Sequence, residues 1–198
     1  MQPITSSSIP EAKVITMAFK KRRSKALTNY KKRIALLKSG STRLVVRKSN
    51  RQITLQLVGY EPNGDKIKAA AYSSELSSLG WLPKCNIPTA YLTGMLLAKK
   101  AQKAGFSGEC ILDIGLYKPI SGNVVFSAAK GFVDGGMSLK SNIEMDENRI
   151  SGKHIMQYAV EGSAKKGHSE LSEYEKAKIN VKELDKLFES VKKKINSE

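Results

Sequence analysis

The chain has 198 residues, 40% of which are hydrophobic, and its 34 basic and 18 acidic residues give it a net charge of +16. The apolar fraction is enough for a packed core, which excludes a wholly disordered chain. No run of 18 or more apolar residues exists, and residues 1–15 lack the apolar block of a secretory signal, so the sequence predicts neither a transmembrane helix nor a cleaved leader.

The positive charge is concentrated at one end of the chain. Residues 1–60 carry fourteen Lys or Arg and a single acid, Glu11, whereas residues 61–198 add a net charge of only +3. Such a local field favours a strongly anionic partner, of which nucleic acid is the commonest. A solvated face normally mixes both signs, and a membrane-binding segment needs more bulky apolar residues than Phe19 alone. We therefore expect a nucleic-acid partner and no membrane.

In chain order, residues 1–18 are polar and Ser-rich, which predicts a flexible leader. Residues 19–40 are expected to form a basic arm followed by a helix. The helical pattern begins near Thr28. Four apolar residues share one face of this helix, namely Leu27, Tyr30, Ile34 and Leu37. Ser39-Gly40 should end this helix, because glycine tolerates a positive φ.

The hydrophobic period then changes to two, which predicts strands over residues 43–48, 52–60 and 66–72. Asn63-Gly64 lies between the last two and is a strong hairpin signal. These three strands are expected to form an antiparallel meander.

The next segments predict a helix over residues 88–104, a strand over 109–114 and a helix over 122–133. The first of these helices is apolar nearly all round, so we expect it to be buried against the sheet, with Gly94 allowing close approach. Trp81 should anchor a loop on the core. The fold class is therefore α/β, with a mixed sheet built from the meander and strand–helix units.

This α/β core is expected to span residues 41–160, and residues 161–198 should form a linker and a C-terminal helical tail. The apolar positions of the tail share one helical face, and they are Val181, Leu184, Leu187, Phe188, Val191 and Ile195. This face could pack on its own domain or on another subunit.

Candidate RNA-binding residues come from three neighbouring segments. The arm contributes Lys20, Lys21, Arg22, Arg23 and Lys25; the helix contributes Tyr30, Lys31, Lys32 and Arg33; the first strand and its turn contribute Arg43, Arg47, Lys48, Ser49, Asn50 and Arg51. Lys and Arg bind phosphates, while Asn and Ser can hydrogen-bond base edges. Residues 43 and 47 share a strand face. The plainer alternatives are a charged hairpin that protects a sheet edge and a Tyr30 that lies in the core.

An enzymatic alternative rests on three carboxylates, Asp65, Asp113 and Asp134, because two-metal phosphodiester cleavage requires clustered acids. Asp65 is equally explained by turn chemistry. Cys85, Cys110, His154 and His168 are scattered, which favours two reduced, buried thiols and predicts no metal site, no cofactor and no catalytic residue. Both histidines are read as surface or RNA-facing residues and not as catalytic ones, and His154 is taken as a candidate RNA contact.

Several motifs in a fixed order resemble one known family. They are Thr28-Asn29-Tyr30-Lys31-Lys32-Arg33, Arg43-Leu44-Val45-Val46-Arg47-Lys48-Ser49-Asn50, Gly80-Trp81, Ala90-Tyr91-Leu92-Thr93-Gly94, Leu112-Asp113-Ile114-Gly115, Asp134-Gly135-Gly136 and Arg149-Ile150-Ser151-Gly152-Lys153-His154-Ile155. The run from about residue 20 to 155 resembles the archaeal and eukaryotic branch of the ribosomal 5S-rRNA-binding family, large-subunit protein L-eighteen, called L-five in eukaryotes.

The resemblance implies a core similar to the ribonuclease-H-like sheet of translation proteins, without catalysis. It implies a structural protein of the large ribosomal subunit in the cytoplasm that binds 5S rRNA and attaches it to the large rRNA in the central protuberance, beside neighbouring ribosomal proteins. The arm, Arg43 and residues 47–51 would lie on the 5S rRNA. The rivals are a metal-dependent nuclease of ribonuclease-H type and a basic DNA-binding protein.

Overall fold

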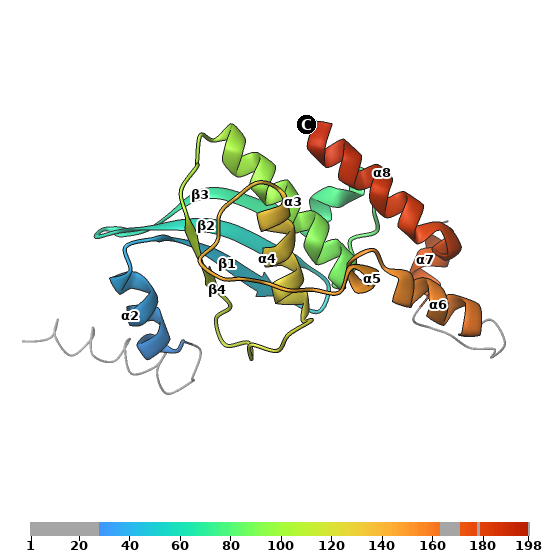
Figure 1. Cartoon of the computed structure of the whole chain (residues 1–198), viewed down its shortest axis with the longest axis horizontal. Coiled ribbons are helices and arrows are strands. Elements are labelled where there is room, and N and C mark those ends of the chain that lie inside the picture. The colour runs from blue at the N-terminus through green and yellow to red at the C-terminus, as the bar shows by residue number, and fades with distance from the viewer. Residues whose placement is uncertain (1–27, 163–170, 178, 198) are drawn as a thin grey trace, which may run out of the picture.

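The computed structural model describes residues 28–162, 171–177 and 179–197 (Figure 1). The expected leader and basic arm, up to residue 27, and most of the expected linker lie outside the described residues. The strands are β1 (Thr42–Lys48), β2 (Ile53–Glu61), β3 (Gly64–Tyr72) and β4 (Cys110–Asp113). The helices are α2 (Tyr30–Lys38), α3 (Ile87–Lys103), α4 (Val124–Asp134), α5 (Glu147–Ile150), α6 (Lys153–Gly162), α7 (Ser172–Lys176) and α8 (Leu184–Ser197).

The sheet is mixed, with the strand order β3-β2-β1-β4. β1, β2 and β3 pair antiparallel as the predicted meander, and β4 pairs parallel to β1. The α/β class and the mixed sheet are confirmed, while the likeness to a ribonuclease-H-like core stays a prediction.

One face of the sheet is covered by helices. The side chains of Leu44, Val46 and Leu55 are fully buried on this face, where α3 packs on β2 and β3 and α4 packs on β1. Two glycines let the helices approach each other closely. A Cβ at Gly94 would lie 2.1 Å from the carbonyl oxygen of Ala128, and a Cβ at Gly131 would lie 2.1 Å from that of Tyr91. The close approach expected at Gly94 is therefore confirmed.

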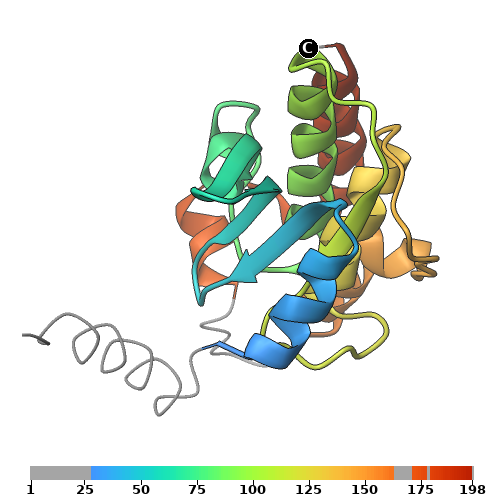
Figure 2. The same cartoon turned by 90° about the vertical axis from the view of Figure 1, so that its left-hand side faces the viewer.

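The apolar face of α8 packs on its own domain. α8 lies along α3 in both views (Figures 1 and 2), and its Phe188 ring contacts the rings of Trp81 and Tyr91 with centroid separations of 6.1 and 5.7 Å. Trp81 is buried and donates a hydrogen bond from Nε1 to Thr89 Oγ1 over 2.8 Å. The alternative in which this face covers another subunit is thus unnecessary, and the predicted anchoring role of Trp81 is confirmed.

α2 lies against the other side of the sheet from α3 and α4 (Figure 2). Asn29 caps its first turn by accepting a hydrogen bond from Lys32 N over 3.1 Å, and Gly40 follows its end with a φ of 65°. No residue of α2 is buried, and Ile34 is mostly exposed. Tyr30 is only half-buried, so the interpretation of Tyr30 as a core residue is wrong.

Two negative findings concern the described residues alone. No helix among them is both long and apolar enough to cross a membrane. Cys85 and Cys110 are both free, and only Cys110 is fully buried. Burial raises the pKa of the Cys110 thiol to about 11, which keeps it protonated at neutral pH. Both thiols are free, as expected, but Cys85 is only half-buried, whereas the sequence predicted two buried thiols.

Candidate nucleic-acid interface

One group of basic residues lies on α2, at the end of β1 and in the turn that follows β1. Its members that are exposed to solvent are Lys31, Lys32, Lys38, Arg47, Lys48 and Arg51, and Arg33 is half-exposed. Arg33 and Arg47 line the same cleft, so the helix and the strand present their charges side by side. Lys20, Lys21, Arg22, Arg23 and Lys25 lie outside the described residues, and their contacts with RNA stay a prediction.

Arg43 does not belong to this exposed group. Its side chain is only 3% exposed, and it lies between two carboxylates. Its Nη2 is 2.8 Å from Asp65 Oδ2, and its Nη1 is 3.4 Å from Asp113 Oδ2. The expectation that Arg43 faces RNA needs correction, because its side chain is buried and is engaged by Asp65 and Asp113.

Arg43 is the centre of a chain of ion pairs that reaches the surface at both ends. Arg33 of α2 donates to Asp65 Oδ2 over 2.8 Å, and Arg47 donates to Asp113 Oδ1 over 3.1 Å. Burial alone would raise the pKa of the Asp65 carboxyl, but hydrogen bonds and charge from Arg43 and Arg33 outweigh it and lower this pKa. Three guanidinium groups therefore share two carboxylates. The exposed ends of this row of ion pairs, Arg33 and Arg47, are both positive.

Arg47 is held in one orientation by several contacts. Besides the Asp113 carboxylate, its Nη1 donates to the carbonyl oxygens of Val46 and Asp113, each over 2.8 Å. Asp113 Oδ1 also accepts from Gly115 N over 2.9 Å, which closes the turn after β4. The side chain of Arg47 is nevertheless 45% exposed, so a fixed guanidinium group faces solvent.

Ser49, in the turn after β1, forms hydrogen bonds within that turn. Ser49 Oγ donates to the carbonyl oxygen of Gln52 and accepts from the amides of Arg51 and Gln52. Its hydroxyl thus stabilises the turn that projects Asn50 and Arg51 into solvent. The proposed base contacts of Ser49 and Asn50 stay predictions.

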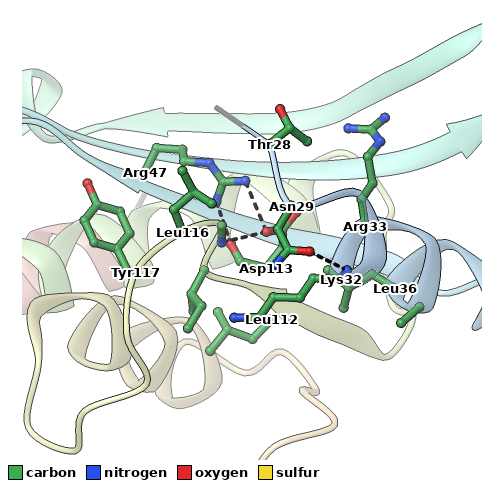
Figure 3. Close-up of a pocket in the computed structure, with 13 residues that line it drawn as sticks. Thr28, Asn29, Lys32, Arg33, Leu36, Arg47, Leu112, Asp113, Leu116 and Tyr117 are labelled. Carbon is green, nitrogen blue, oxygen red and sulfur yellow. Dashed lines mark hydrogen bonds and ion pairs between the residues drawn. The ribbon is translucent and has the colours of Figure 1, made fainter. Parts of the chain in front are cut away.

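A cleft with a volume of about 610 Å³ separates α2 from the segment that follows β4. Figure 3 shows Lys32 and Leu36 of α2 on one side and Leu116 and Tyr117 on the other, with Arg47 above them. The cleft therefore has apolar walls and a cationic rim. Leu116 and Tyr117 were missed by sequence reasoning, because an exposed leucine and tyrosine in a loop give no periodic signal.

The three acids of the enzymatic alternative do not converge. Asp65 and Asp113 are both engaged by arginines, whereas Asp134, at the end of α4, pairs with Lys130 over 3.1 Å and accepts from Tyr91 Oη over 2.8 Å. In the part of the chain that the structure describes, no group of three or more His, Cys, Asp or Glu could hold a metal ion. The described geometry thus lacks the clustered acids that two-metal cleavage requires.

His154 lies apart from the basic group. It belongs to α6, which lies at the opposite end of the molecule from α2 (Figure 1), where it lines a second pocket with Tyr158 and Tyr174. Burial and the charge of Arg149 lower its pKa, so the neutral imidazole predominates at neutral pH. The structure does not bring this residue together with the other candidates.

Comparison with known proteins agrees with the motifs. The family described as "Ribosomal large subunit proteins 60S L5, and 50S L18" matches residues 16–107. A large ribosomal subunit protein uL18 of Korarchaeum cryptofilum is 40% identical over 184 residues, which cover 89% of this chain and 92% of the relative. The same protein of Methanoculleus marisnigri is 50% identical over 144 residues, covering 71% and 82%, and that of Haloarcula marismortui is 46% identical over 141 residues, covering 70% and 75%. With nearly the whole chain aligned to one of these archaeal relatives, the chain belongs to the uL18 family of large ribosomal subunit proteins.

Proposed function

We propose that this protein is a structural constituent of the large ribosomal subunit that binds 5S rRNA and attaches it to the large rRNA in the central protuberance. It acts on cytoplasmic ribosomes, beside neighbouring large-subunit proteins, and carries no catalytic activity. Membership of the uL18 family supports the ribosomal role. The 5S rRNA partner is what the family resemblance implies, and the individual contacts are our inference from the surface of the protein.

The proposal rests on the distribution of charge around α2 and β1. The basic residues Lys32, Arg47 and Arg51 are exposed, while the nearby carboxylates of Asp65 and Asp113 are withdrawn between arginines. A phosphate backbone approaching this side meets exposed cations, and each of the two carboxylates is paired with two arginines. Contacts of this kind position RNA by its shape and its phosphates, and they leave sequence reading to unpaired bases.

The test is a comparison of 5S rRNA with duplex DNA at equal salt. If about 6–10 phosphates are neutralised, affinity for 5S rRNA should fall about 10³- to 10⁵-fold between 50 and 200 mM salt. Reversing two charges, Arg47→Glu with Arg51→Glu, should weaken binding and flatten this salt dependence. The control reverses Lys186 and Lys193, which are exposed on α8, and should leave the affinity nearly unchanged.

Two outcomes would contradict the proposal. Equal affinity for 5S rRNA and duplex DNA would favour a general basic DNA-binding protein. Unchanged 5S rRNA binding after the double charge reversal would show that the turn after β1 is not part of the interface. Deleting residues 20–25 tests the arm in the same assay. A stable and uncut complex with 5S rRNA in Mg²⁺ is expected, and cleavage that Asp113→Asn abolishes would instead support the nuclease.

A further inference from the structure

The cleft between α2 and the segment after β4 has the size and chemistry of a small-ligand site. Its volume of about 610 Å³ falls within the range of roughly 300–1,000 Å³ typical of such pockets. The apolar lining comes from both sides, and includes Leu36, Leu112, Ile114, Leu116 and Tyr117. A cleft that exposes this much apolar surface beside a cationic rim suits a ligand with a flat apolar part and an anionic part.

The cationic rim is held in place before any ligand arrives. Arg47 is fixed by hydrogen bonds to Val46 O, Asp113 O and Asp113 Oδ1, and Arg33 is fixed on the other side by Asp65. The side chains of both arginines stay partly exposed, and Lys32 also lines the cleft. Because the arginines are already oriented, less side-chain entropy is lost when they bind an anion.

The aromatic wall is also fixed. Tyr117 Oη donates a hydrogen bond to the carbonyl oxygen of Lys48, at the end of β1, and Tyr117 N donates to Ile114 O over 3.3 Å. These contacts tie the loop after β4 to the strand that carries Arg47. Leu116, beside Tyr117 in the same wall, is 60% exposed. A leucine this exposed gains little from the protein's own packing, so it is available to a ligand.

We propose that this cleft receives one unstacked nucleotide of the bound RNA, with its base between the apolar walls and its phosphate at Arg47. This rests on the proposed function and deepens it, since it names which part of the RNA is read as a base. Unpaired bases in RNA are typically splayed out and stacked on aromatic side chains or guanidinium planes. An acidic peptide would also satisfy the cations, but the surrounding basic surface is suited to a continuous phosphate backbone.

The first experiment locates the nucleotide by photocrosslinking. A benzophenone amino acid replaces Leu116 in the full-length chain, and the matched control places it at Ile120, which is equally exposed at 60% in the same loop but does not line the cleft. With 5S rRNA, position 116 should crosslink to one unpaired nucleotide that position 120 does not reach. Diffuse crosslinking, or capture of a ribosomal protein by position 116 in complete large subunits, would overturn the proposal.

The second experiment removes the base. A 5S rRNA with an abasic ribose at the crosslinked position should bind the unaltered protein about 5- to 150-fold more weakly than intact RNA. Leu116→Ala should weaken binding of intact RNA but should not weaken binding of the abasic RNA further, because both changes remove the same contact. Equal affinity for intact and abasic RNA would overturn the proposal and leave 5S rRNA binding standing. If the unaltered protein does not bind intact 5S rRNA at all, the result would instead contradict the proposed function.

Discussion

Gly115 lies directly against the guanidinium group of Arg47. A Cβ at this position would come within 2.9 Å of Arg47 Cζ and 3.1 Å of Nη1, and the φ of Gly115 is 63°. The left-handed backbone conformation favours glycine, and an added Cβ would force the Arg47 side chain to shift. This pair explains why an Asp-x-Gly turn follows β4, since Asp113 binds Arg47 from one side while Gly115 makes room for it.

Gly115→Ala should therefore weaken 5S rRNA binding as well as stability. The left-handed conformation alone should cost about 1–2 kcal/mol in the free energy of unfolding. Gly40→Ala is the matched control, because Gly40 has a φ of 65° but nothing within 4 Å of its added Cβ. Both variants should lose stability in urea titrations, and only Gly115→Ala should also displace Arg47 and lower the affinity. Equal affinities for the two variants would show that the position of Arg47 does not matter for binding.

Asp113→Asn should destabilise the protein by about 3 kcal/mol, because it leaves the buried Arg43 with one carboxylate in place of two. The control is Glu61→Gln, which breaks an exposed pair with Lys66 at 3.6 Å and should cost about 0–1 kcal/mol. Chemical denaturation of both variants measures the difference. Similar losses for the two would mean that Arg43 is stable without its second partner.

Gly94→Ala should be destabilising even though alanine is the better helix former by about 1 kcal/mol. The new Cβ would lie 2.1 Å from the carbonyl oxygen of Ala128, so α3 and α4 must move apart. Overpacking of this kind typically costs about 1–3 kcal/mol. Lys103→Ala, at an exposed position of the same helix, should change the free energy of unfolding by less than about 0.5 kcal/mol. A stabilised Gly94→Ala variant would contradict the observed helix packing.

The ion pairs of Asp65 predict a specific loss of stability in acid. Because the folded pKa of Asp65 lies below its unfolded value, its contribution is present above about pH 4 and is lost as the pH falls through the folded pKa. Asp65→Asn should therefore flatten the fall in the free energy of unfolding below about pH 4. Arg33→Gln removes one of the two guanidinium partners and should give an intermediate slope. An unaltered slope in Asp65→Asn would exclude this carboxyl as a source of acid sensitivity.

Much of the fold could be predicted because it depends on neighbouring residues. Alternation correctly predicted the strand β2, whose Ile53, Leu55 and Leu57 are fully buried, and the continuous apolar run over 88–104 correctly predicted a buried α3. The position of α2 was predicted, but the alternative that Tyr30 lies in the core was wrong. Helical periodicity shows which residues share a face and not whether another element covers that face.

The sequence by itself determined the positive end of the chain, the meander, the buried helix and, through its ordered motifs, the family. Only the tertiary structure decided the partners of the arginines. Asp113 lies beside β1 because β4 pairs parallel to it, with Val45 opposite Asp113, and Asp65 reaches Arg43 through the turn between β2 and β3. Such long-range register is set by packing of the whole sheet, so no local pattern distinguishes the buried Arg43 from the exposed Arg47, although both stand on the same face of one strand.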